Sequence, residues 1–330
     1  MDELERRIRA ARPLSGHRHL PLTGRAKQEL ADLVLSSPNV PPASRRLGPS
    51  PGHPRRFSRR LMLIASSLAA FAIAGGVTLN ILPDTPASAA TPPLLVTDHI
   101  DASAEEILDE SAKLMLQRDP PPNRIRMETW VLNTEIDANG TIISSSVEPR
   151  HEEITFVGDG NVHVVVTVAP PFPGQKTEHL ATPGTVLSDE TFAPGEFDTP
   201  YPEAVPTEPT EIADYLATVA GSEQPLGAGE TIQEVSSILS SNVLSRDQES
   251  ALLSYVSGLP NLEVAGRVTD RLGRDGIAIR ATDRDPGHVE DLLIISPRAG
   301  SITAAETIYI GNDRTDIASP SVIHYVAWDR

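Results

Sequence analysis

A run of 22 uncharged residues constrains the fold of this chain more than any other feature. The run extends from Leu61 to Leu82 and reads LMLIASSLAAFAIAGGVTLNIL. As an α-helix, at about 1.5 Å per residue, it would be roughly 33 Å long, which matches the hydrocarbon core of a bilayer. A buried core helix is the alternative, but such helices rarely exceed about 18 residues without a charged face. We therefore predict a transmembrane helix over residues 61–82.

The charges on either side of this run predict how the helix is oriented. Residues 1–60 hold 13 Lys and Arg against 5 Asp and Glu, a net +8, whereas residues 83–330 hold 15 against 40, a net −25. Four arginines lie directly before the run: Arg55, Arg56, Arg59 and Arg60. After the run, no Lys or Arg follows until Lys113. Because basic flanks stay in the cytoplasm, we expect a cytoplasmic N-terminus and a C-terminal domain outside the cell membrane.

A cleaved signal peptide is the alternative to an anchor. Ala87, Ser88 and Ala89, followed by Ala90, form an acceptable cleavage pattern. A signal peptide, however, has a short charged region and an apolar core of roughly 7 to 15 residues. Here 60 residues precede a run of 22. We predict an uncleaved single-pass anchor, and the sequence leaves cleavage after Ala89 open.

Composition divides the remainder of the chain. Residues 1–35 hold two short stretches with helical spacing of apolar residues, which predict a small cytoplasmic helical head. Residues 36–60 are rich in Pro and Arg and predict a disordered linker, whereas residues 83–100 predict an exported tether. Helix orientation and anionic lipid explain the basic charge, so we expect the lipid bilayer and no nucleic acid as a partner. The exported folded domain is expected over residues 101–330.

Residues 101–168 predict one helix followed by four strands. Ser103 and Glu106 form a capping box at the start of the helix, in which each residue bonds a free amide of the other. Alternating apolar residues then predict two hairpins. The turn of the first is Asn139-Gly140, and the turn of the second is Gly158-Asp159-Gly160.

Residues 169–209 carry nine prolines and predict a long irregular loop. Four aromatic residues are spaced along this loop: Phe172, Phe192, Phe197 and Tyr201. A loop of this kind either wraps the core with its aromatic side chains or covers a ligand. We keep both interpretations and take these four residues as the candidate ligand-covering loop.

The remainder of the exported part predicts three helices and then about five strands. Apolar stripes at helical spacing run from Ile212 to Val219, from Ile232 to Leu239 and from Leu252 to Leu259. The strands that begin near Leu262 are expected to form a second sheet region. Helices and strands in separate runs predict an α+β fold with an antiparallel sheet, not a doubly wound nucleotide-binding fold.

No residue pattern in the chain indicates catalysis. The lack of cysteine excludes disulfides, thiolate zinc sites and cysteine nucleophiles. No phosphate-binding loop, serine-hydrolase elbow or zinc-protease motif occurs. The exported histidines are scattered singly, and His288, Glu290 and Asp291 are interpreted as a loop before a strand. We expect no enzymatic activity, no cofactor and no metal site.

The stretch from Leu252 to Ala281, LLSYVSGLPNLEVAGRVTDRLGRDGIAIRA, combines a Gly-Leu-Pro at a helix end with a Gly-Arg-Asp-Gly-Ile-Ala turn. In these residues the chain resembles an uncharacterised actinobacterial family of single-pass membrane proteins. This resemblance implies an association with extracytoplasmic-function sigma factors, and thus a sigma factor as a partner of the cytoplasmic head. The exported pattern also resembles the half-barrel of periplasmic lipoprotein carriers and of a sigma-regulatory sensor domain, in which helices cover a curved antiparallel sheet.

Two functions are compatible with this organisation. The first is a membrane-anchored extracytoplasmic binding or sensor module for an apolar or other envelope ligand. The alternative is a tethered carrier of a lipid or other apolar molecule, with the aromatic loop closing over the sheet. The sequence leaves open the identity of the ligand, the direction of any signal and the oligomeric state.

Overall fold

The computed structural model describes residues 91–136, 142–175, 180–197, 199–201, 203–314 and 316–330. The helical elements of these residues are α3 (Ala104–Met115), the 3-10 turn η1 (Gly158–Gly160), α4 (Pro209–Ala220), α5 (Ala228–Ser241) and α6 (Arg246–Ser257). The strands are β1 (Arg124–Ile136), β2 (Ile142–Val147), β3 (Arg150–Phe156), β4 (Val162–Val168), β5 (Val186–Phe192), β6 (Glu263–Thr269), β7 (Asp275–Ala281), β8 (Val289–Ile295), β9 (Ile302–Tyr309) and β10 (Ser321–Trp328).

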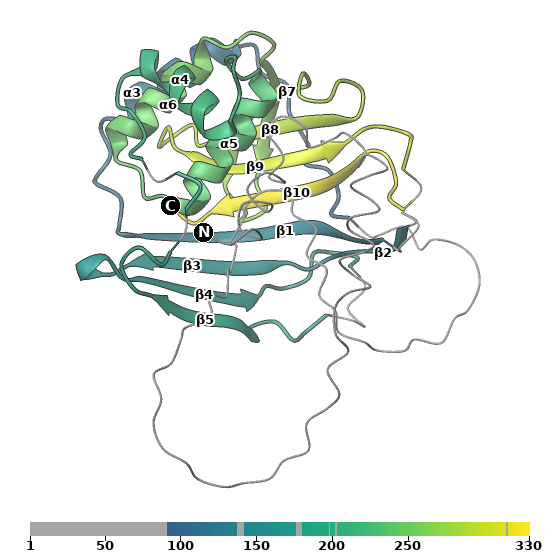
Figure 1. The fold of residues 1–330 in the computed structure, drawn as a ribbon. Helices are drawn as coiled ribbons and strands as arrows, with labels where there is room; N and C mark the ends of the chain where they lie inside the picture. The colour runs from purple at the N-terminus through teal and green to yellow at the C-terminus, as the bar shows by residue number, and fades with distance from the viewer. Residues whose placement is uncertain (1–90, 137–141, 176–179, 198, 202, 315) are drawn as a thin grey trace, which may run out of the picture. The chain divides into compact units, whose positions relative to one another are not determined.

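All of these strands belong to one antiparallel sheet. Their order is β5-β4-β3-β1-β10-β9-β8-β7-β6, and β2 pairs with β1 beside this path. The sheet is curved, and the helices gather over the part formed by β7 to β10, whereas β3, β4 and β5 extend beyond them (Figure 1). We call the side that carries the helices the helix face and the opposite side the outer face. The predicted α+β class with an antiparallel sheet is confirmed.

The local predictions for the first half of the domain are confirmed. The Glu106 amide donates to Ser103 Oγ at 3.1 Å, and the Ser103 amide donates to Glu106 Oε2 at 3.0 Å, so the capping box is present. Strands β3 and β4 form the predicted hairpin, with Asp159 at a φ of 68° in its turn. Strands β1 and β2 are paired as expected, although their turn at residues 137–141 lies outside the described residues.

The prediction of a second sheet region is wrong, because β6 to β10 continue the first sheet. Strand β10 pairs with β1, with Met127 opposite Trp328 and Thr129 opposite Val326. This pairing joins segments about 200 residues apart in the chain. Hairpins are specified by nearby turn residues, but a pairing of this range depends on which strand edges remain free after folding.

The prediction of an irregular loop over residues 169–209 is wrong for Val186–Phe192, which form β5. This strand pairs with β4, and Val164 faces Glu190. Its sequence, VLSDETF, places Ser188 and Glu190 on the face where an inner strand would carry apolar residues. Because β5 is an edge strand, polar residues are tolerated there, and the usual alternation is missing.

None of the helices in the described ranges has the length and apolar character needed to cross a membrane. The predicted span over residues 61–82 is outside those ranges, as are the head and the linker. The same applies to the four orienting arginines: Arg55, Arg56, Arg59 and Arg60.

Helix α5 lies at the centre of the main core. Ile232, Val235 and Ile238 of this helix have no solvent-exposed surface. They pack with apolar residues from α3, α4, α6 and the helix face of the sheet. Helices α3 and α6 pack against each other, and the Ser250 hydroxyl of α6 donates to the carbonyl of Ala112 at 2.9 Å. The helices therefore seal the helix face over this part of the sheet.

The segment before α3 is paired with the domain, although residues 83–100 are expected to form a tether. The Asp98 amide donates to the Arg267 carbonyl at 2.9 Å, and the Arg267 amide donates to the Asp98 carbonyl at 2.7 Å. Gly266, next to this bridge, has a φ of 137°, and a Cβ there would lie 2.5 Å from the Asp98 carbonyl oxygen. The close approach of the segment to β6 therefore requires glycine at this position.

We predict that Gly266→Ala separates this segment from β6. The expected loss in the free energy of unfolding is about 2 kcal/mol, from backbone strain and from the displaced Asp98 carbonyl. Gly273→Ala is the matched control, because Gly273 also has a positive φ but has no atom within 4 Å of the added Cβ. Strain alone should cost this control about 1 kcal/mol. Urea denaturation measures both losses, and equal losses in the two variants would contradict the prediction.

Candidate functional site

The candidate site is the part of the helix face that the helices do not cover. An irregular segment within residues 193–208 connects β5 to α4 and lies over this part; we call it the strap. The Phe197 ring contacts Phe156 of β3 and Phe192 of β5, at centroid distances of 6.3 and 5.6 Å. All three rings are partly exposed and pack against the main core. The strap thus covers the β3–β5 surface with an aromatic cluster instead of a helix.

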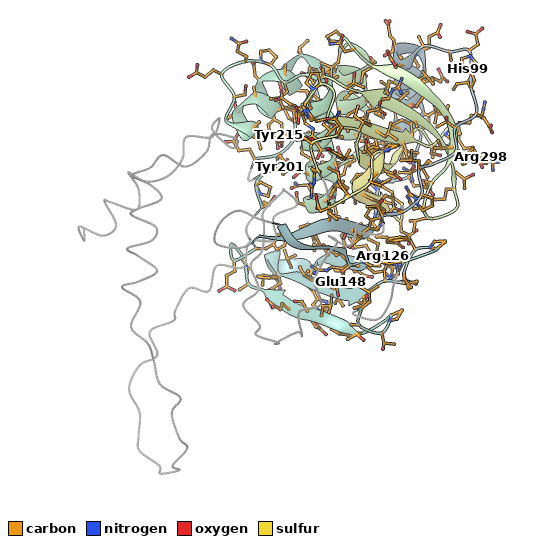
Figure 2. The ribbon with its side chains drawn as sticks, turned by 90° about the vertical axis from the view of Figure 1, so that its right-hand side faces the viewer. His99, Arg126, Glu148, Tyr201, Tyr215 and Arg298 are labelled. Atoms are coloured by element: carbon orange, nitrogen blue, oxygen red, sulfur yellow. The ribbon has the colours of Figure 1, made fainter. Side chains whose placement is uncertain are left out.

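One tyrosine fixes the strap to the helical layer. The Tyr201 hydroxyl donates to Glu234 Oε2 of α5 at 2.6 Å, and the residue is 3% exposed. Burial raises the pKa of Tyr201 above its ordinary value, and the nearby Glu234 carboxylate adds to this rise. Figure 2 shows Tyr201 close to Tyr215 of α4, where the helices meet the strap. A second bond, from Gln248 Nε2 of α6 to the Val205 carbonyl at 2.8 Å, holds the far end of the strap.

The four aromatic residues of the predicted ligand-covering loop do not lie together. Phe192, Phe197 and Tyr201 belong to the core of the helix face, whereas Phe172 packs on the outer face. There its ring lies 6.0 Å from that of Trp130. The strand β5 separates the two groups along the chain and forms the edge of the sheet. Because that strand is not evident in the sequence, the four residues could not be assigned to two faces.

A charged residue is buried at the centre of the outer face. Arg271 donates to both carboxylate oxygens of Glu306, at 2.9 and 3.1 Å, and Glu306 is fully buried. The guanidinium lies 5.7 Å from the ring centroids of Trp130 and Tyr325. Burial raises the pKa of Glu306, and Arg271 opposes this rise. Arg271 also donates to the Pro93 carbonyl at 2.8 Å, which connects this ion pair to the segment before α3.

Only one residue in the sequence hints at this ion pair. Glu306 is the one charged residue in the otherwise apolar or small-residue strand ITAAETIY, which is a pattern that indicates a buried partner. Arg271 lies in the turn between β6 and β7, 35 residues earlier. No spacing rule relates the two residues, because they meet only through the pairing of several strands.

The interpretation of His288, Glu290 and Asp291 as a loop is wrong for the two acidic residues. Both lie in β8, and Asp291 is fully buried on the helix face. It accepts bonds from Arg284 at 2.8 and 2.9 Å, and from Gln233 of α5 and Thr307 of β9, each at 2.9 Å. All of its oxygen atoms are thereby bonded. The arrangement ties α5 to the sheet and leaves no free carboxylate for chemistry.

The described histidines do not form a common centre. His151 faces Glu128 at 3.0 Å and His163 faces Asp189 at 2.8 Å, both as cross-strand pairs at the surface. In the ranges that the structure covers, no group of three or more His, Asp or Glu side chains is placed to hold a metal ion. The geometry thus offers packing surfaces and ion pairs, and the strap-covered β3–β5 surface is the candidate site.

Comparison with known proteins gives structural matches without sequence matches. No family model matches the chain, and no curated protein matches it by sequence. A structure of MucB in complex with MucA(peri) matches with a TM-score of 0.27 and 11% identity, over 69% of this chain and 54% of that chain. A lipoprotein-sorting protein domain from Vibrio parahaemolyticus matches with a TM-score of 0.21 and 12% identity, over 69% and 92%.

A LolA superfamily protein from Nitrosomonas europaea matches with a TM-score of 0.17 and 9% identity, over 70% of this chain and 93% of that chain. These matches are similarities of structure alone. The chain spans only about half the length of the MucB structures. Identities and TM-scores this low do not identify a shared function.

We predict that Tyr201→Phe loosens the strap. The variant keeps the buried ring but leaves Glu234 without its hydroxyl donor, so the free energy of unfolding should fall by about 1 kcal/mol. Limited proteolysis should then cut the strap faster. Tyr215→Phe is the comparison, because its hydroxyl bonds the Glu203 carbonyl of the same strap at 3.2 Å, but at the surface. If the Tyr215 variant is cut as fast as the Tyr201 variant, Tyr201 is not the main attachment.

We predict that the free energy of unfolding depends on pH because of His324. The residue is half-buried and its Nδ1 is shielded from solvent without a partner, and burial lowers its pKa from 6.5 to about 4. The unfolded chain therefore binds more protons than the folded chain between these values, so stability is lost as the pH falls through this window. His324→Gln should remove about 2 kcal/mol of the difference between pH 7 and pH 4.5.

Chemical denaturation at the two pH values measures this difference. The matched control is His99→Gln, the same substitution at an exposed imidazole. The same pH dependence in the wild type and in His324→Gln would show that His324 is not responsible.

Proposed function

We propose that this protein is a membrane-anchored, non-catalytic binding module whose folded domain lies outside the cytoplasm. The observation that carries the proposal is the strap over the β3–β5 surface. Helices seal the remainder of the helix face, but here an irregular segment with partly exposed phenylalanine rings takes their place. Such a segment can detach from the sheet without the unfolding of a helix. The apolar surface beneath it then becomes available to a ligand or a partner.

Two side-chain hydrogen bonds hold the strap against the helices. The contacts of Tyr201 with Glu234 and of Val205 with Gln248 hold it to α5 and α6. A partner that supplies an apolar group in place of Phe197 would gain the same contacts with Phe156 and Phe192. The proposed binding site is therefore the surface formed by these two residues and the apolar residues of β4.

The sensor role rests on the connection between the domain and the segment that precedes it. Residues 91–98 contact the domain through the backbone pairing of Asp98 with the edge strand β6 and through the bond from Arg271 to the Pro93 carbonyl. The apolar run at residues 61–82 and its flanking arginines support an anchor with a cytoplasmic head. We propose that binding at the domain is transmitted along this segment, and that a sigma factor is the partner of the head, as the sequence resemblance implies.

A tethered carrier of a lipid or other apolar molecule is the second candidate. The aromatic strap favours it, because a carrier needs a movable cover over an apolar sheet. A carrier also needs an internal volume for its cargo. A hollow of about 370 Å³ lies at the end of α3, and no strap residue lines it. We propose the binding module first, because it requires no internal volume beneath the strap.

We predict that the domain is digested by protease added to intact cells, whereas an N-terminal tag stays protected and membrane-bound. The charge asymmetry around residues 61–82 is the physical reason for this expectation. Immunoblotting of the tag after membrane fractionation measures the outcome. A soluble exported species that begins near Ala90 would contradict the anchor and favour a released carrier.

We predict that the full-length protein, extracted in mild detergent, carries no stoichiometric apolar ligand in native mass spectrometry. One lipid per chain would instead identify a carrier. In that case, loss of the lipid in Phe197→Ala would place it under the strap, and Arg298→Gln would be a control on an exposed turn.

A further inference from the structure

A groove opens beside the end of β10, away from the strap. Its wider part has a volume of about 370 Å³ and its narrower part about 50 Å³. The segment after α3, the beginning of α6 and the last residues of β10 line it. Both parts share Pro121, Pro122, Leu244 and Arg330, so they form one continuous depression. We call it the arginine groove.

Most of the described arginines that form no ion pair with a carboxylate line this groove. The exported part of the chain is strongly acidic, and most described arginines form an ion pair with a carboxylate. Across the described ranges, Arg118, Arg124, Arg246 and Arg267 are the arginines that have no such pair. All of these except Arg267 line the groove. Their concentration at one place in an acidic domain indicates a site for a negatively charged ligand.

The acidic residues of the groove do not cancel this charge. Glu249 is fully buried, pairs with Arg330 and accepts the Ile302 amide at 3.2 Å. Asp119 and Asp329 also line the groove, but the three guanidinium groups without a carboxylate partner outnumber them. Arg246 donates only to the backbone carbonyl of Arg118, at 3.2 Å, so most of its donors stay free.

A buried donor provides a second, independent observation. Trp328 lines the narrower part of the groove and is 1% exposed. Its Nε1 is shielded from solvent and has no acceptor among the described residues. Buried N–H groups are nearly always paired in folded proteins. Trp328 thus lines the groove and carries an unpaired donor that is itself shielded from solvent.

We propose that the arginine groove binds an extended acidic peptide segment of a protein partner. Its positive charge occupies two places, with Arg118 and Arg246 in the wider part and Arg124 in the narrower part beside Trp328. A single phosphate group can occupy one of these places, whereas an extended chain can present carboxylates to both. The groove shares no lining residue with the strap, so this site is additional to the proposed binding surface.

The test uses the full-length protein in detergent and a fluorescent ten-residue peptide of alternating Glu and Val. We expect the Glu peptide to bind at least about tenfold more tightly than the same peptide with Gln for Glu. The double substitution Arg118→Gln and Arg246→Gln should weaken binding at least about fivefold. Arg298→Gln, at a side chain that is 88% exposed in the turn after β8, should leave binding unchanged. Equal binding of the two peptides, or an unaffected double variant, would overturn the proposal.

Two further measurements distinguish a peptide site from a phosphate site. Arg124→Gln removes the guanidinium of the narrower part and should weaken binding of the Glu peptide roughly threefold to tenfold, whereas a phosphate held by Arg118 and Arg246 should bind unchanged. If this variant does not fold, the Arg118 and Arg246 variants decide the question. Inorganic phosphate and vesicles containing phosphatidic acid are the competing probes. If either binds in an Arg118- and Arg246-dependent way while the Glu peptide does not bind, the groove is a phosphate site and the peptide proposal is wrong.

Discussion

The pairing of β1 with β10 is the interaction on which the remainder of the structure depends. It joins the β1–β5 half of the sheet, formed early in the chain, to the β6–β10 half formed at its end. Without it, the helices would cover only the second half, and the first would be a separate meander with one unprotected apolar face. Because loop closure over this distance is entropically costly, the core that both halves share must offset that cost.

The same pairing positions the two proposed binding surfaces. On one side of β1 it places the β3–β5 surface next to α5, so that the strap can reach Glu234 with Tyr201. At the other end it brings Trp328 and Arg330 against the segment after α3, which creates the arginine groove. The outer face is organised differently, around a buried ion pair that also holds the segment before α3. The proposed strap-covered surface and the ion pair that holds the segment before α3 thus lie on opposite faces of one sheet.

Features that depend on neighbouring residues could be predicted from the sequence. The capping box at Ser103 and the turn at Asp159 were predicted because the residues that make each feature are at most three positions apart. The strand β5 is not evident in the sequence because its inward positions are polar, and the place of Asp291 is not evident because its partners come from α5, from β9 and from the loop before β8. Phe172 was grouped with the strap residues because nearness in the chain does not reveal the face of a sheet.

The most direct test of the central claim is photo-crosslinking from the strap of the full-length protein in living cells. A photoreactive amino acid replaces Phe197 in one variant and Arg298, on an exposed turn, in the other. The account predicts a discrete adduct, with an envelope protein or an apolar ligand, from position 197 and not from position 298. The same weak pattern of products from both positions would contradict the proposal that the strap covers a binding surface.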